Sequence, residues 1–160
     1  MSEVLGTLFK YLLAVLAIGA VVLIFYEGFT SNKVGTEASN ITSIQAAAAQ
    51  LYSGQSNTTS LSAKVLIAAG SAPSSMVSGT TLVNPWGGAV TVTGDATDDI
   101  IVSDSGLSQT ACAKLVTSVT NFTSIAINGG TAATPPVDPS TVSTGCIAGS
   151  TNKLVFTFNS

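Results

Sequence analysis

The two cysteines are the first residues that could do chemistry, and the rest of the sequence restricts what that chemistry can be. Cys112 and Cys146 lie 34 positions apart, neither belongs to a C-x-x-C motif, and the chain has no histidine. The usual zinc sites and every triad that uses histidine are therefore excluded. In an exported chain a disulfide between them is expected, and it would stabilise the fold by roughly 3–4 kcal/mol. Two separate buried thiols are the alternative.

A cluster of acids is the second group that could do chemistry. Asp95, Asp98, Asp99 and Asp104 could approach one another across a hairpin and hold Ca²⁺ through oxygen ligands. Their spacing matches no EF-hand loop, which favours a solvated acidic loop. Serine and threonine are abundant, but no general base accompanies them and no G-x-S-x-G motif is present. We therefore expect no catalytic residue, no metal and no cofactor.

The charge composition excludes further classes. The chain has 5 Lys+Arg against 8 Asp+Glu, a net charge of −3, and only 8% charged residues. A surface that binds nucleic acid needs clustered basic residues, so nucleic-acid binding is not expected. Soluble monomers usually carry more surface charge than this. We expect a surface that is covered by neighbouring subunits or that works outside a cell.

The apolar residues gather at the N-terminus. From Val4 to Tyr26 the sequence contains Lys10 as its single charge, and the stretch is long enough to cross a bilayer as a tilted helix. A cleaved signal peptide is the alternative. However, Glu3 stands where basic residues are expected, and no small-x-small cleavage site follows Ile24. The stretch is predicted to be a retained membrane segment.

Beyond Tyr26 the apolar pattern narrows to one helix face. No proline precedes Pro73, and Gly19 weakens a helix without ending it. One helix is thus predicted from the N-terminus to about Ser53, roughly 80 Å long. Its first half is apolar on all sides, and its second half carries a stripe at helical spacing: Val34, Ala38, Ile41, Gln45, Ala48 and Leu51, with Ile44 and Ala47 beside it.

The remaining sequence predicts short helices and strands. A helix capped at Ser60 or Ser62 ends at Gly70, and a second, capped by Ser108, covers residues 107–120. Residues 128–145 are predicted as a long loop. The runs of β-branched or aromatic residues are predicted strands, and they cover residues 89–93, 100–103, 122–127 and 153–158. The fold class is α+β, with a long N-terminal helix packed on a small antiparallel sheet and a disulfide-closed C-terminal region.

Three motifs carry a family resemblance. N-P-W-G-G stands at Asn84–Gly88, M-x-S-G precedes it at Met76–Gly79, and the cysteine pair comes late in the chain. With the long helix, these features resemble the type IV pilins. They are most similar to the type IVb branch, in particular the major pilins of plasmid-borne conjugative thin pili. The motif residues Asn84, Pro85, Trp86, Gly87 and Gly88 are expected to form a structural turn with an aromatic anchor.

The resemblance implies a domain plan. Residues 1–27 would form the transmembrane and filament-core half of the helix, and residues 28–160 the globular head. Within the head, 28–53 is the amphipathic half of the helix, 54–88 the loop between helix and sheet, and 89–160 the sheet and disulfide region.

The resemblance also implies an assembly site at the N-terminus. Such pilins lose a short leader, so Met1 would be the processed first residue. The family carries Glu at its fifth mature position, where this chain has Leu5, and Glu3 is the early acid. Glu3 would pair with the α-amino group of Met1 in an adjacent subunit or with Lys10. A carboxylate solvated at the membrane surface is the alternative.

The expected function is structural. The chain would be a major pilin that polymerises through its N-terminal helix into an extracellular filament, for cell–cell contact such as mating-pair stabilisation. Its partners would be copies of itself, the inner-membrane assembly machinery, the membrane before assembly, and a recipient or host cell surface. A minor pilin or adhesin, or a type II secretion pseudopilin, is the alternative.

Overall fold

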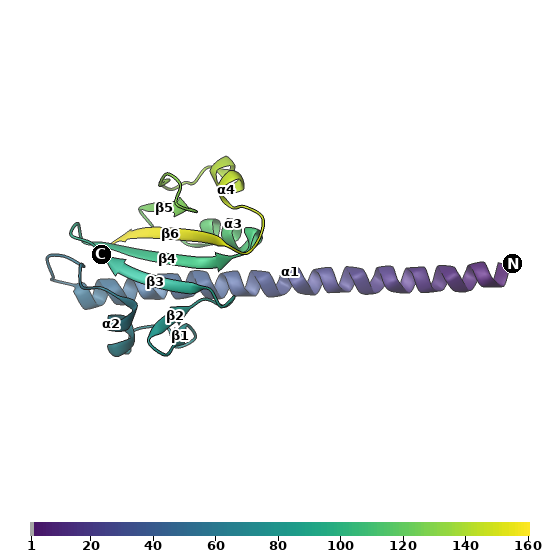
Figure 1. Cartoon of the computed structure of the whole chain (residues 1–160), viewed down its shortest axis with the longest axis horizontal. Coiled ribbons are helices and arrows are strands. Elements are labelled where there is room, and N and C mark those ends of the chain that lie inside the picture. The colour runs from purple at the N-terminus through teal and green to yellow at the C-terminus, as the bar shows by residue number, and fades with distance from the viewer. Residues whose placement is uncertain (1) are drawn as a thin grey trace. The chain divides into compact units, whose positions relative to one another are not determined.

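A single long helix opens the chain. The computed structural model describes residues 2–160, and within the helix it describes the side chains of all but residues 2, 3, 5 and 19–27. Helix α1 covers Ser2–Tyr52 without a break, which confirms the predicted helix (Figure 1). The chain divides into two compact units, one ending at Asn32 and the other covering Lys33–Ser160.

The apolar part of α1 is the predicted membrane segment. Among the residues whose side chains are described, no helix carries an apolar stretch long enough to cross a membrane. The expected span from Val4 to Tyr26 includes residues 19–26, whose side chains lie outside that part of the structure.

The second unit is built on one antiparallel sheet of six strands, in the order β1-β2-β3-β4-β6-β5. Strand β6, the last in sequence, lies between β4 and β5, and Phe156 is in register with both Val102 and Ile125. The strand bounds are β1 Val77–Ser78, β2 Thr81–Val83, β3 Ala89–Gly94, β4 Asp99–Leu107, β5 Ser124–Ile127 and β6 Asn152–Asn159.

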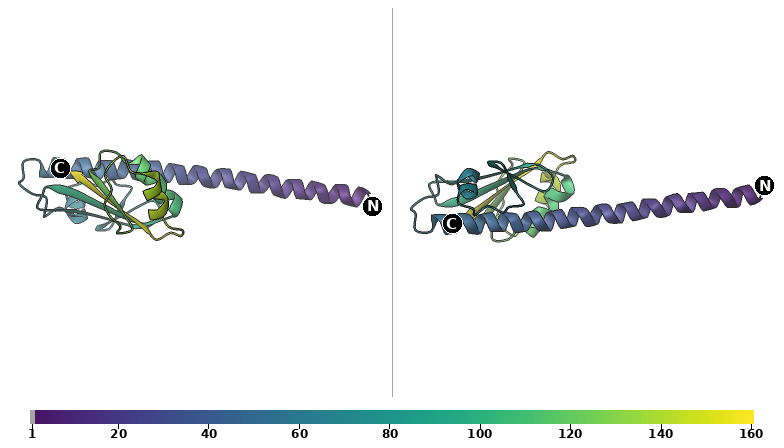
Figure 2. Two further views of the ribbon diagram at one scale, coloured as in Figure 1. Left: turned by 90° about the horizontal axis from the view of Figure 1, so that it is seen from above. Right: turned by 90° about the horizontal axis from the view of Figure 1, so that it is seen from below.

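One face of this sheet is buried and the other is not. Alternate residues of β6 are buried, as expected when one face of a strand packs on a core. Residues 33–52 of α1 cover that face, and Figure 2 shows the sheet on one side of this part of the helix. The core joins α1, the sheet and α3 (Gln109–Ser118), and its largest members include Ile41, Ile44, Leu115, Leu154 and Phe156.

Each short helix begins at a side-chain cap. Ser62 accepts a hydrogen bond from the backbone of Val65 at the start of α2 (Ala63–Ala68), and Ser108 accepts one at the start of α3. Asp138 caps α4 (Pro139–Gly145), whose first residue is proline. Such caps satisfy backbone N–H groups that a helix start leaves without partners.

Three short elements were not predicted from the sequence. Residues 54–88 contain β1 and β2, and the predicted loop at 128–145 contains α4. Strand β1 has two residues and β2 has three, too short for a periodic pattern. Their strand conformation depends on the ladder with β3, where Leu82 pairs with Val90.

Two predicted environments are also wrong. Asp104, expected in a solvated loop, is fully buried because β4 continues to Leu107 and places it on the inner face after Ile100 and Val102. The buried stripe of α1 also differs. Leu51 is exposed, whereas Glu37 is fully buried on the stripe.

Candidate functional site

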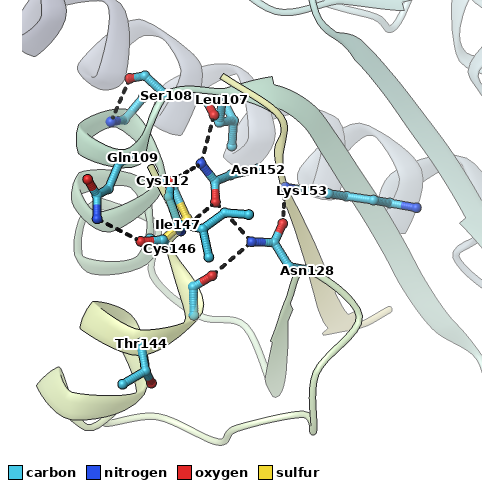
Figure 3. Close-up of a disulfide and its surroundings, with 12 residues drawn as sticks. Leu107, Ser108, Gln109, Cys112, Asn128, Thr144, Cys146, Ile147, Asn152 and Lys153 are labelled. Atoms are coloured by element: carbon cyan, nitrogen blue, oxygen red, sulfur yellow. Dashed lines mark hydrogen bonds between the residues drawn. A yellow bond between two sulfur atoms is a disulfide. The ribbon is translucent and has the colours of Figure 1, made fainter. Parts of the chain in front are cut away.

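The predicted disulfide is present. Cys112 on α3 and Cys146 after α4 are bonded, with their Cα atoms 5.8 Å apart, and both side chains are buried (Figure 3). The side chain of Gln109 donates a 3.0 Å hydrogen bond to the carbonyl of Cys146. The bond and this contact fix the end of α4 against α3.

Asn152 is the polar centre of the same region. Its Nδ2 donates to the carbonyls of Leu107 and Ile147, at 3.0 and 2.9 Å, and its Oδ1 accepts from the backbone amide of Ile147 and from the side-chain Nδ2 of Asn128 (Figure 3). The side chain is fully buried. Because all four of its hydrogen-bonding positions are occupied, its burial leaves no polar group unsatisfied.

Asn128 continues this network. It adopts a left-handed conformation, with φ of 52°, that asparagine tolerates better than most residues. Its side chain donates to the carbonyl of Gly145 and accepts from the amide of Lys153. The end of β5 is thereby joined to α4 and β6. Neither asparagine was singled out from the sequence.

The N-P-W-G-G motif forms a turn organised by Asn84. The side-chain oxygen of Asn84 accepts hydrogen bonds from the amides of Trp86 and Gly88, at 3.0 and 2.8 Å. Its Nδ2 donates to the carboxylate of Asp104 and to the carbonyl of Ser105, both at 2.7 Å. Trp86 is half-buried and packs on the core. The motif thus fastens the β2–β3 turn to the irregular end of β4.

Glycine is required where this turn meets β4. A Cβ on Gly88 would lie 1.8 Å from the carbonyl oxygen of Ser105, so a side chain cannot be accommodated without moving the backbone. Gly87 has a positive φ of 83°, but a Cβ there would meet no atom within 4 Å. The two glycines therefore serve different purposes, close approach and turn conformation.

Two buried acids lie between α1 and the sheet. Glu37 and Asp104 are both fully buried, and one oxygen of each, Oε1 and Oδ2, has no hydrogen-bond partner. Burial, with repulsion from Asp104, raises the pKa of Glu37 to about 8. Burial raises the pKa of Asp104 to about 6, against the opposing effect of its hydrogen bond from Asn84.

Glu37 could have been found from the sequence. It lies three residues after Val34 and four before Ile41, on the stripe that the structure buries. A charged residue at such a position is unusual on a core-facing helix surface and indicates a polar contact across the interface.

The other three acids lie at the β3–β4 hairpin. Asp95 Oδ1 accepts hydrogen bonds from the amides of Thr97 and Asp99, and these bonds lower its pKa. Asp98 accepts a bond from the hydroxyl of Ser160. Across the part of the chain that the structure describes, no group of three or more acids, cysteines or histidines could hold a metal ion.

The N-terminal part of α1 presents apolar side chains to solvent. Those described between residues 4 and 18 are between 52% and 70% exposed: Val4, Leu8, Phe9, Tyr11, Leu12, Leu13, Val15, Leu16 and Ile18. Lys10 is exposed among them. Met1 lies outside the described residues, as does the side chain of Glu3. An apolar surface of this kind requires a partner.

Comparisons with known proteins agree with this fold. Residues 31–159 match the PilS N-terminal family. The fold is similar to that of the solved structure of TcpA, a type IV pilin from Vibrio cholerae El Tor biotype, with a TM-score of 0.57 and 22% sequence identity over 81% of this chain and 99% of that chain. No curated protein sequence matches. The chain belongs to the PilS N-terminal family, a family of type IV pilins, and is a pilin subunit of a pilus.

Proposed function

We propose that this pilin is the major subunit of its filament and that copies polymerise through the apolar part of α1. The observation that carries the proposal is the exposure of apolar side chains on every turn of residues 4–18. These side chains would lie in the inner membrane before assembly and against other copies afterwards. Each copy would then replace lipid contacts by protein contacts, and a repeated contact without closure gives a helical filament.

At the N-terminus we propose a charge pair between subunits. Glu3 of one copy would meet the α-amino group of Met1, the processed first residue, in the next copy, with Lys10 as the alternative partner. A paired carboxylate costs far less in an apolar surrounding than a single one. Replacing Glu3 by Gln should reduce filament number, and Lys10→Gln should do so only if Lys10 is the partner.

A substitution in the apolar surface tests the polymerisation proposal. Leu12→Gln places an uncharged polar group on the exposed apolar surface, and Thr42→Gln is the matched control at an exposed position of the same helix in the head. Electron microscopy should show filaments for the control and few or none for Leu12→Gln, with the subunit still in the membrane fraction. Normal filaments from Leu12→Gln would contradict the proposal.

We further propose that the filament serves cell–cell contact such as mating-pair stabilisation. The N-P-W-G-G motif and the cysteine pair, which resemble those of thin-pilus pilins, support this role. Deletion of the gene should reduce transfer in liquid mating more than on a solid surface. The amount of the chain in purified filaments separates a major subunit from a minor pilin or adhesin. A minor pilin or adhesin would be present in an amount far below that of the main component.

A further inference from the structure

Two buried carboxyl groups, contributed by different elements, lie close enough to repel each other. Glu37 comes from α1 and Asp104 from the inner face of β4, and both side chains have no exposed surface. Glu37 Oε1 and Asp104 Oδ2 each lack a hydrogen-bond partner. Two ionised carboxylates without full pairing are expensive in a protein interior.

The surroundings favour a negative charge on Asp104 and not on Glu37. Asn84 donates a 2.7 Å hydrogen bond to Asp104, whereas Glu37 accepts, from the described part of the chain, a longer bond of 3.5 Å from Asn40. The side-chain oxygen of Asn40 accepts a hydrogen bond from the hydroxyl of Ser75, so the Asn40 amide that contacts Glu37 is itself fixed by an uncharged partner.

Among the residues that the structure describes, no positively charged side chain shifts the pKa of either carboxyl. Asp104 is the charged group that acts on Glu37 from the elements packed against it. Lys33, one turn earlier on α1, is exposed.

We propose that Glu37 and Asp104 form a proton-binding site that holds one proton, on Glu37, in the folded head at neutral pH, and that loss of this proton loosens α1 from the sheet. A protonated Glu37 carries no charge, so it is buried at lower cost and is no longer repelled by Asp104. The arrangement makes the packing of residues 33–52 on the sheet sensitive to pH. The proposal concerns the head alone and does not depend on how the filament is used.

The direction of the pH effect follows from the folded and unfolded pKa values. Glu37 has a pKa of about 8 in the fold against 4.5 as its ordinary value. The folded chain therefore binds a proton that the unfolded chain releases. The stabilisation is complete below the unfolded pKa and is lost as the pH rises through about 8.

Thermal unfolding of the full-length chain in a mild detergent tests the site. The wild-type unfolding temperature should fall between about pH 5 and about pH 9, and unfolding at pH 7 should release about one proton. Glu37→Gln keeps a neutral donor at the same place. It should remove most of this pH dependence and unfold several degrees above wild type at about pH 8.5. Asp138→Asn is the control, since asparagine also caps a helix, and it should retain the wild-type decline.

Two results would overturn the proposal. One is a parallel decline of Glu37→Gln and wild type, or a lower unfolding temperature of the variant at about pH 8.5. The other is a carbon-13 NMR titration of the wild-type Glu37 carboxyl that shows it ionised at neutral pH, a measurement that decides the question even if the variant fails to fold. Stabilisation of wild type by Ca²⁺, with loss of that effect in Glu37→Gln, would count against it as well, because the site would then hold a cation.

Discussion

Asn84 donates a 2.7 Å hydrogen bond to Asp104, a residue twenty positions later in the chain, in the interior of the head. The same amide group accepts bonds from the turn that follows it, so one side chain connects the N-P-W-G-G turn to β4. Because Asp104 also disfavours a negative charge on Glu37, the turn, the sheet and the long helix are coupled through two buried residues.

Gly88→Ala should be strongly destabilising. The added methyl group would overlap the carbonyl oxygen of Ser105, whereas Gly87→Ala meets open space and has to adopt only a positive φ. We expect a loss of 3 kcal/mol or more for Gly88→Ala and about 1 kcal/mol for Gly87→Ala, on the scale of backbone strain. Urea unfolding of the two variants measures the difference, and equal losses would rule out the close-approach explanation.

Removal of the disulfide should destabilise the head without changing its fold. Replacing Cys112 and Cys146 together by Ser frees a closed loop of 34 residues, which should cost about 2–5 kcal/mol. Unfolding in the presence and absence of reductant is the measurement. Wild type should become less stable when reduced, while the double variant should not respond. A reductant effect on the double variant would mean that the loss has another cause.

Asn152→Asp should destabilise the head, because it replaces the buried side-chain amide by a carboxyl group. The two bonds that its Nδ2 donates to Leu107 and Ile147 would be lost, and a carboxyl group would face two carbonyl oxygens. We expect a loss of roughly 3 kcal/mol or more. The exposed Asn57→Asp, which keeps its acceptor for Thr59, should stay within about 0.5 kcal/mol of wild type. Chemical denaturation of both variants provides the comparison, and similar losses would contradict the role given to Asn152.

The long helix should stay helical around Gly19 in the filament. Its backbone is helical there in the single chain, and no proline precedes Pro73. Gly19→Ala should therefore still assemble, since alanine favours a helix by up to about 1 kcal/mol over glycine. A filament map tests the backbone directly. An extended segment of many residues between Lys10 and Tyr26, or failure of the variant to assemble, would show that assembly requires a break or a close helix contact at Gly19.

Helices with strong local signals could be predicted from the sequence. The caps at Ser62 and Ser108 and the absence of proline before Pro73 depend on neighbouring residues, so they are visible without the fold. Helix α4 also had such a signal, Asp138 followed by Pro139, but it is short and lies among loop-forming residues.

Features that depend on distant residues could not be predicted. Strands β1 and β2 exist because β3 pairs with β2, and the burial of Asp104 depends on how far β4 extends beside β6. The role of Asn152 depends on bonds to residues 107, 128 and 147, which only the folded chain brings together.

The place of β6 in the sheet sets the order in which the head can be completed. Residues 152–159 lie between β4 and β5 and bring Leu154, Phe156 and Phe158 into the core. Until they arrive, β4 has an open inner edge and β5 has no neighbouring strand in the ladder. Contacts between such distant parts of a chain form slowly. The head therefore reaches its final structure only after β6 has joined the sheet, so its folding cannot finish while residues 152–159 are still being synthesised.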